Sequence, residues 1–316
     1  MDSSLVVLGG VHAFCSPLSE SKRCSLSPGL AELLSISSLM SLDLSECLHI
    51  SGTELVRGLK ESNAATPKLE ALNLRSCTYL RVSQSSTVLL HPGGEREKSA
   101  ACVLSLQDLA VFSLAQLLRD SLRELDLTSC VNVTDLSVCA IATYLQKLEV
   151  LRLGWCKEVT DWGLLGMVQT SQCEPDDETG DRGPRFTRTF GNMGFFKPPQ
   201  MPFEDRPKLV TQNDLEQFKQ SAGASLLALK RLQELDLSAC SKLTDSSITQ
   251  GMHFPDLQRL SLAMLPEITD ASVASVGWHC RSLTSLELSH CPGITDRGLA
   301  QAVPHLHRLQ HIDLSC

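Results

Sequence analysis

The chain has 316 residues, of which 42% are hydrophobic, 20% charged and 4% aromatic, and its formal net charge is -8. This length and apolar content allow a large buried core. The acidic balance, without a Lys/Arg-rich run, argues against a nucleic-acid partner and favours basic or neutral protein partners. No apolar stretch approaches the length of a transmembrane helix, so we expect no membrane partner.

The N-terminal segment, residues 1–38, comes before the first clear repeat. Its apolar stretch from Leu5 to Val11 follows Asp2 and lacks the basic region of a signal peptide. We expect residues 1–38 to form an irregular or degenerate capping segment and residues 39–316 to form one repeat domain.

From residue 39 onward the pattern Leu-x-x-Leu-x-Leu-x-x-Cys recurs, for example from Leu122 to Cys130 and from Leu283 to Cys291. The last four leading leucines, from Leu232 to Leu309, are 25 or 26 residues apart. This period is typical of leucine-rich repeats, in which each unit supplies one strand and one helix and buries its apolar face against its neighbours. The pattern predicts an α/β fold, a leucine-rich repeat horseshoe solenoid with a parallel concave sheet and outer helices.

Six of the 13 cysteines occupy the same repeat position: Cys47, Cys77, Cys130, Cys156, Cys240 and Cys291. Leu265 takes this position in another unit, so we interpret it as a site for a small-to-medium apolar group that does not need a thiol. Free buried thiols imply a reducing compartment, and we expect the cytoplasm or also the nucleus. No Cys-x-x-Cys pair occurs, so we predict no metal site.

A Thr-Asp pair follows the repeat cysteine or its replacement in five units, at Thr134, Thr160, Thr244, Thr269 and Thr295. Residues of helical periodicity come next. A row of five aspartates could be a metal or catalytic array, but local chemistry explains each pair. Threonine caps the first turn of a helix, and aspartate stabilises the positive end of the helix dipole.

Two segments interrupt the repeat period. Residues 80–102 contain a His-Pro-Gly-Gly sequence and a charged run, and a helical face returns between Leu106 and Leu117, so we predict a loop inserted between a strand and its helix. Residues 174–207 form a Pro/Gly/Phe-rich insert in which arginines and prolines separate the phenylalanines. This insert could bind a partner or fold back on the solenoid.

The Leu-x-Leu alternation predicts that the residues between the leucines face the concave surface. On this reading Glu124 with Asp126, and Glu234 with Asp236, form carboxylate pairs facing the hollow. Paired carboxylates can catalyse hydrolysis, but the sequence shows no pocket signature, partnered nucleophile or Gly-rich phosphate loop. We therefore expect a protein that is not an enzyme and needs no cofactor.

The concave strip is mostly acidic, with Arg75, Arg152 and Arg259 interspersed. Such a strip suits a basic or mixed-charge polypeptide, although exposed strands need polar residues for solvation in any case. We expect reversal of charge at Asp126 and Asp236 to weaken binding and leave the fold intact. The predicted protein-binding residues are Glu124, Asp126, Arg152, Trp155, Glu234, Asp236, Arg259 and Glu287, with Trp155 and Met264 as apolar anchors.

The units LRELDLTSCVNVTDLSV and LTSLELSHCPGITDRGL resemble the cysteine-containing subclass of leucine-rich repeats found in F-box leucine-rich repeat proteins. The resemblance implies a substrate-recognition receptor of an SCF-type cullin-RING ubiquitin ligase, which presents a protein substrate for ubiquitin-dependent degradation and has no catalytic residues of its own. Its implied partners are a protein substrate and, where a docking element is present, the SCF adaptor and cullin.

The sequence departs from this family at its N-terminal end. Residues 1–38 are short for an F-box, with no Leu-Pro opening, and the first tryptophan is Trp155. We expect either a fragment or isoform lacking the F-box or a chain that acts without the ligase. The alternative function is a ligase-independent leucine-rich repeat interaction or inhibitor protein.

Overall fold

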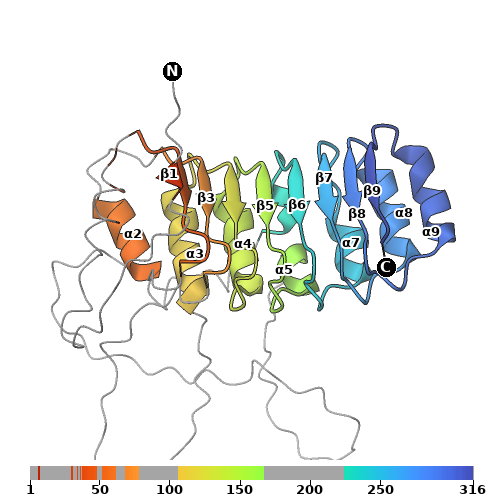
Figure 1. The fold of residues 1–316 in the computed structure, drawn as a ribbon, viewed down its shortest axis with the longest axis horizontal. Coiled ribbons are helices and arrows are strands. Elements are labelled where there is room, and N and C mark those ends of the chain that lie inside the picture. The colour runs from red at the N-terminus through yellow and green to blue at the C-terminus, as the bar shows by residue number, and fades with distance from the viewer. Residues whose placement is uncertain are drawn as a thin grey trace, which may run out of the picture.

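The computed structural model describes residues 6–7, 30, 34, 36, 38–47, 52–61, 68–77, 106–166 and 224–315. Their strands form one nine-stranded parallel sheet in which the order of the strands is their order along the chain. Figure 1 shows this sheet from one end of the molecule to the other. The predicted α/β leucine-rich repeat solenoid is confirmed.

The strands are short. They are β1 (Val6–Val7), β2 (Ser41–Asp43), β3 (Ala71–Asn73), β4 (Glu124–Asp126), β5 (Val150–Arg152), β6 (Glu234–Asp236), β7 (Arg259–Ser261), β8 (Ser285–Glu287) and β9 (His311–Asp313). From β2 onward, the central residue of each strand pairs with the central residue of the next. This residue is a buried leucine from β2 to β8, so the predicted inward alternation is confirmed.

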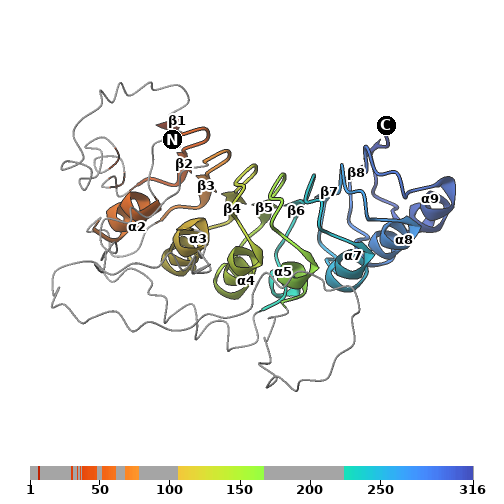
Figure 2. The same cartoon turned by 90° about the horizontal axis from the view of Figure 1, so that it is seen from below.

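The helices lie on the other side of the leucine layer. They are α2 (Gly52–Glu61), α3 (Leu106–Leu117), α4 (Asp135–Tyr144), α5 (Asp161–Leu165), α7 (Asp245–Gly251), α8 (Asp270–His279) and α9 (Asp296–Ala302), with the short turns η2 (Leu226–Ala228) and η3 (Val303–His305). They form an outer arc, with the strands on its inner side (Figure 2). None of the described helices has the length and apolarity needed to cross a membrane.

The sheet continues without a gap across both interruptions of the repeat. Strand β3 pairs directly with β4, and β5 pairs directly with β6 although 81 residues separate Arg152 and Glu234. No strand therefore lies between β3 and β4 or between β5 and β6. Helix α3 confirms the helical face predicted after the first loop. The loop at residues 80–102 and the insert at residues 174–207 lie outside the described residues.

Most of the N-terminal capping segment predicted for residues 1–38 also lies outside the described residues. Within it, Val6 and Val7 form β1 and pair in parallel with Leu42 and Asp43 of β2. The sequence analysis did not predict this strand, because two valines without a repeat motif carry no signal of register.

The Thr-Asp pairs join neighbouring repeats. Each of the five threonines caps its helix as predicted, and its hydroxyl accepts the N–H of the residue two positions later. In four of the five pairs the aspartate accepts two bonds, from the N–H and the hydroxyl of the threonine in the next repeat. For Asp135 and Thr160 these bonds are 2.7 and 2.6 Å long. The capping interpretation was therefore correct but omitted this contact between repeats.

Asp108 of α3 is the first aspartate in this series of hydrogen bonds between repeats, and no threonine precedes it. Its carboxylate accepts the N–H and hydroxyl of Thr134 at 3.0 and 2.9 Å, and the Ser137 hydroxyl at 2.5 Å. Burial raises the pKa of Asp108 to about 6, against the opposing effect of these bonds. At the other end, the N–H and hydroxyl of Thr295 lower the pKa of Asp270.

The repeat cysteines are free thiols, as predicted. In five repeats the thiol also donates to the carbonyl of the preceding repeat's third leucine, for example from Cys156 to Leu127 and from Cys240 to Leu153, both at 3.2 Å. Leu265 is fully buried at this position, so an apolar group is accepted there, but the interpretation omitted the hydrogen bond that the thiols make. Burial raises the pKa of Cys130 and Cys240 to about 12, so these thiols stay protonated and able to donate.

Candidate functional site

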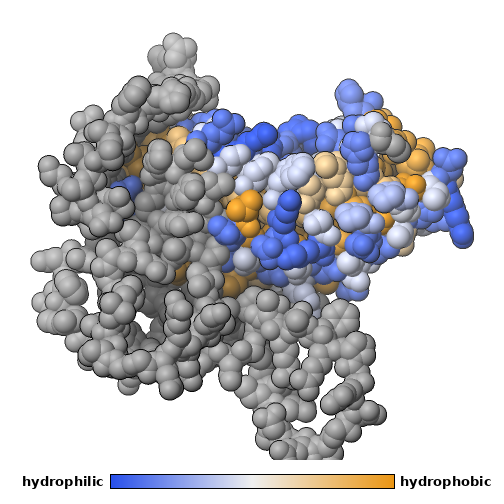
Figure 3. All heavy atoms as spheres, turned by 60° about the horizontal axis from the view of Figure 1, so that its bottom comes forward, coloured by the Kyte–Doolittle hydropathy of each residue, from blue (hydrophilic) through white to orange (hydrophobic). Residues whose placement is uncertain are grey.

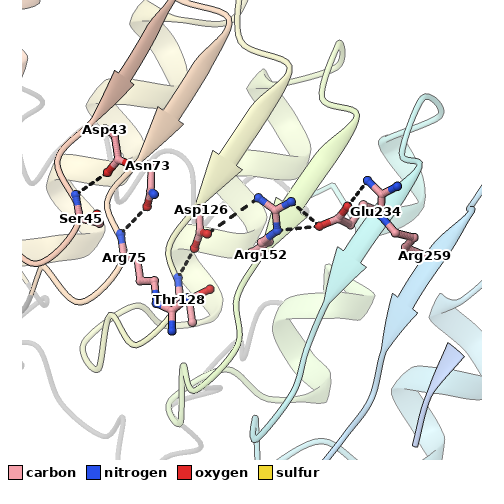
Figure 4. Close-up of polar contacts among 9 residues, drawn as sticks. All are labelled: Asp43, Ser45, Asn73, Arg75, Asp126, Thr128, Arg152, Glu234 and Arg259. Atoms are coloured by element: carbon pink, nitrogen blue, oxygen red, sulfur yellow. Dashed lines mark hydrogen bonds and ion pairs between the residues drawn. The ribbon is translucent and has the colours of Figure 1, made fainter. Parts of the chain in front are cut away.

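The last residues of several strands, on the concave face of the sheet, form a row of turn-forming side chains. Five of them accept the backbone N–H two residues later at 2.8 to 3.0 Å: Asp43, Asn73, Asp126, Asp236 and Asp313. Three of these bonds are drawn in Figure 4. This is the local bond by which Asp and Asn stabilise a turn.

These turn-forming bonds contradict the expectation that charge reversal at Asp126 and Asp236 leaves the fold intact. Reversing the charge of Asp126 or Asp236 would also remove a turn-forming bond, so these variants would not leave the fold untouched. Their carboxylates have a structural role that composition and strand alternation did not reveal.

Glu234 is the centre of an ion-pair network across three strands, shown in Figure 4. Its side chain is only 12% exposed, and each of its oxygens receives one guanidinium. The Nε of Arg152 donates to Oε1 at 2.6 Å, and the Nε of Arg259 donates to Oε2 at 2.5 Å. Arg152 also approaches Asp126, with 3.9 Å between Nη1 and Oδ2.

The network makes the centre of the face close to charge-balanced. Two arginines meet two carboxylates there, and Glu234 fixes both guanidinium groups. The predicted carboxylate pairs are therefore wrong as free pairs, because Glu234 faces arginines and Asp126 accepts a backbone N–H. The arrangement does not resemble two carboxylates flanking a reacting bond.

Two carboxylates of the predicted set stay open to solvent. Glu124 of β4 and Glu287 of β8 are exposed, and Glu287 accepts the Ser261 hydroxyl at 2.8 Å. They lie on opposite sides of Arg152, Glu234 and Arg259, which belong to β5, β6 and β7. The outer acidic groups are therefore free to meet a cationic partner, whereas Glu234 already binds two arginines and Asp126 and Asp236 accept backbone N–H groups.

A second row of side chains follows the strands, at the residue before the repeat cysteine or, for Met264, before the leucine that replaces it. All seven members have left-handed backbone with φ between 56° and 64°: Glu46, Ser76, Ser129, Trp155, Ala239, Met264 and His290. Each N–H donates to a carbonyl of the next repeat, as from Trp155 to Ser238 at 2.7 Å. These bonds hold a conformation that is otherwise unfavourable for a bulky residue.

The predicted apolar anchors belong to this left-handed row. Trp155 is 41% exposed and Met264 is 40% exposed. Sequence reasoning placed them at the strand ends but missed their shared backbone conformation. The available signal was the variety of residue types at this position, which marks a surface site.

Exposed apolar side chains also occur on the helices, at Trp162 of α5 and Trp278 of α8. Figure 3, which views the molecule between its strand side and its lower edge, shows hydrophobic residues in separate patches among hydrophilic ones. Trp278, the most exposed tryptophan, packs its ring on that of His305 with 4.1 Å between centroids. Among the described residues, no three His, Cys, Asp or Glu side chains converge as metal ligands.

One comparison with known proteins supports the repeat architecture. A family model described as Leucine Rich repeat matches residues 279–300, which include β8 and the start of α9. A solved structure titled "Crystal structure of Rad7 and Elc1 complex in yeast" matches with 14% identity and a TM-score of 0.24, covering 85% of this chain and 74% of that chain. At that TM-score the likeness carries no argument about function.

Proposed function

We propose that this chain is a protein-binding receptor that holds a partner polypeptide on the concave face of its sheet. The observation that carries the proposal is the Arg152–Glu234–Arg259 network, which fixes charged groups on an open, curved surface. Repeat solenoids commonly use such extended concave surfaces for binding. Fixed side chains lose less conformational entropy when a partner binds.

The distribution of charge defines the kind of partner. The centre is balanced and its arginines are engaged, while Glu124 and Glu287 are exposed on either side. A polypeptide with cationic groups at its two ends and polar groups between them would match this pattern. Electrostatic complementarity of this type sets orientation and association rate more than affinity.

The finer form of the proposal is a substrate-recognition receptor of an SCF-type cullin-RING ubiquitin ligase. It rests on the resemblance of the repeats to those of F-box leucine-rich repeat proteins. In this role the chain presents a substrate and performs no catalysis itself. The alternative is a ligase-independent interaction or inhibitor protein that uses the same face.

Affinity capture from cells tests both forms. The tagged chain is recovered in the presence of proteasome and neddylation inhibitors, and its partners are identified by mass spectrometry. Cullin-RING subunits beside specific partners would support the ligase form. Specific partners without these subunits would favour the alternative, and no specific partner would contradict the receptor function.

Variants at the two open carboxylates show whether the concave face is responsible. Glu124→Lys with Glu287→Lys should reduce recovery of the specific partners at least about fivefold, because both outer charges are reversed. The matched control is Asp256→Lys, a charge reversal at an exposed residue in the turn between α7 and β7. Equal recovery by the double variant and the control would exclude this face.

A further inference from the structure

Arg152 and Arg259 bind the same carboxylate but differ in the surroundings of their outer edges. Each guanidinium directs Nε and Nη2 to one oxygen of Glu234. The Nη1 group of Arg152 then faces Asp126, with 3.9 Å between Nη1 and Oδ2. Among the described residues, Glu234 is the only hydrogen-bond or ion-pair partner of the Arg259 side chain. The edge that Nη1 and Nη2 of Arg259 form is therefore open.

The exposed fractions show the same asymmetry. The Arg259 side chain is 56% exposed, whereas that of Arg152 is 34% exposed. In Figure 4, Arg259 lies at one end of the network, with Glu234 on one side of its guanidinium and no drawn contact on the other. A guanidinium carries five N–H donors in a planar fork, and its Nη1–Nη2 edge matches the two oxygens of a carboxylate.

Glu234 fixes the position of this open edge. Its side chain is 12% exposed and holds a guanidinium on each oxygen, so Arg259 cannot turn away without leaving a nearly buried charge short of a partner. An arginine that is ordered in advance loses less conformational entropy on binding than a mobile one. Glu234 is therefore a positioning residue for the donor edge of Arg259.

The carboxylates around Arg259 would repel an acidic group that has no basic neighbour. Glu287 on the next strand is exposed, its Oε2 accepts the Ser261 hydroxyl at 2.8 Å, and Oε1 has no partner among the described residues. Arg259 pairs with Ser285, two residues before Glu287. With about 4.8 Å between strands and about 6.6 Å between alternate residues, the Cα atoms of Arg259 and Glu287 are about 8 Å apart. Alternate side chains of an extended peptide have a similar separation.

We propose that the open Nη1–Nη2 edge of Arg259 binds the carboxylate of an Asp or Glu side chain in an extended partner segment, and that a Lys or Arg two residues away binds Glu287. The inference rests on the proposed receptor function and deepens it by naming the chemical pattern of the partner. Arg152 makes no such contact, because its own outer edge already faces Asp126. A segment with only basic residues would instead meet the positive charge of Arg259.

Peptide selection on the purified full chain tests the pattern. The probe is a library of random peptides displayed on phage. The enriched peptides should share an acidic and a basic residue separated by one position. Enriched peptides without an acidic residue, or a selection that enriches no peptide, would overturn the proposal.

Matched variants of the two arginines locate the acidic residue of the peptide. Arg259→Gln removes the open edge, and affinity for the enriched peptides in calorimetric titration should fall at least about tenfold. Arg152→Gln is the control, because it also takes one guanidinium from Glu234 but loses an edge that faces Asp126, and affinity should change less than about threefold. Thermal unfolding checks that both variants fold. Equal losses of affinity in the two variants would overturn the proposal.

A change in the peptide keeps the test independent of how the variants fold. Replacing the acidic residue by its amide should weaken binding to the natural chain at least about tenfold, and binding to Arg259→Gln less than about threefold, since that variant lacks the edge. An unchanged affinity of the natural chain, or the same loss with both chains, would reject the contact at Arg259.

Capture from cells separates this inference from the receptor function. Partners lost with the Glu124→Lys, Glu287→Lys chain and also with Arg259→Gln would support both. Partners lost with the double variant but retained by Arg259→Gln would reject the inference and preserve the receptor function. Partners that both variants retain would contradict both.

Discussion

Two rows of acidic side chains run along this molecule, one at the helix N-termini and one on the concave sheet. In the helix row, five aspartates from Asp108 to Asp270 each hold the threonine of the next repeat. In the concave row, some carboxylates form local turns, Glu234 holds two arginines, and Glu124 and Glu287 remain open. Both rows recur with the repeat, but the helix row joins repeats and the concave row is partly available to a partner.

The difference comes from register between repeats. An aspartate at a helix start faces the threonine of the next repeat, because stacking places equal positions side by side. A concave side chain faces whatever residue the neighbouring strand carries, so its environment changes from one repeat to the next. Acidic periodicity alone therefore does not identify a binding surface.

Removing a carboxylate from the helix row should have the largest effect. Asp135→Ala leaves the N–H and hydroxyl of Thr160 without their acceptor, and we expect a loss of roughly 3 kcal/mol of stability from two charge-assisted bonds. Urea unfolding measures this loss. Glu124→Ala in the concave row is the control, and equal losses in the two variants would contradict the distinction between the rows.

Glycine permits the close approach of the helices at this row. A Cβ added at Gly163 would lie 2.5 Å from Oδ1 and 2.8 Å from Cα of Asp135. Gly163→Ala should therefore cost about 2 kcal/mol, because the backbone of α4 or α5 must move.

Gly251→Ala provides the matched control in α7. There the added Cβ meets only Cδ2 of Leu165 at 3.5 Å, an ordinary contact. Thermal unfolding should show a lower midpoint for Gly163→Ala and an unchanged or higher one for Gly251→Ala, since alanine favours helix. A tolerated Gly163→Ala would show that the helix row does not need this close packing.

The pH dependence of stability should reveal the burial of Asp108. Its folded pKa of about 6 lies above the ordinary pKa of an aspartate, so the folded state binds the proton more tightly than the unfolded state does. The contribution of this group is therefore fully present below about pH 4 and is lost as the pH rises through about 6. We expect a loss of about 1 to 2 kcal/mol across this range.

Asp108→Asn isolates that contribution because asparagine does not titrate. The natural chain should lose unfolding free energy relative to Asp108→Asn as the pH rises from 4 to 7. Asp270→Asn should give the opposite slope, since Thr295 lowers the pKa of Asp270 and its contribution is lost as the pH falls. A constant difference for Asp108→Asn would show that its burial does not perturb its titration.

The sequence was sufficient for features that depend on one repeat. The leucine alternation predicted the buried strand centres, and the Thr-Asp pairs predicted the caps at Thr134 and its four counterparts. It was insufficient where a contact spans two repeats. The acceptor of the Cys156 thiol, the threonine held by Asp135 and the arginines around Glu234 all come from a neighbouring unit. In the last case the partners are 82 positions apart in the sequence.

The candidate binding surface could also be predicted only in part from the sequence. Glu124 and Glu287 are exposed as expected, and Trp155 is an exposed apolar side chain. The roles of Asp126 and Asp236 in turns follow from a φ/ψ geometry that spacing does not encode. The left-handed row was also hidden, because six residue types occupy it and none is the glycine that would have signalled positive φ.

The smallest effect is expected where the concave row is open. Glu124→Gln and Glu287→Gln keep the shape of each side chain and remove its charge, and neither carboxylate belongs to the Glu234 network. Each should change the unfolding free energy by less than about 0.5 kcal/mol, because exposed charges contribute little to stability. Added salt should leave this difference nearly unchanged. A loss above about 1 kcal/mol in urea unfolding would mean that these residues also hold repeats together, and the contrast between the two acidic rows would fail.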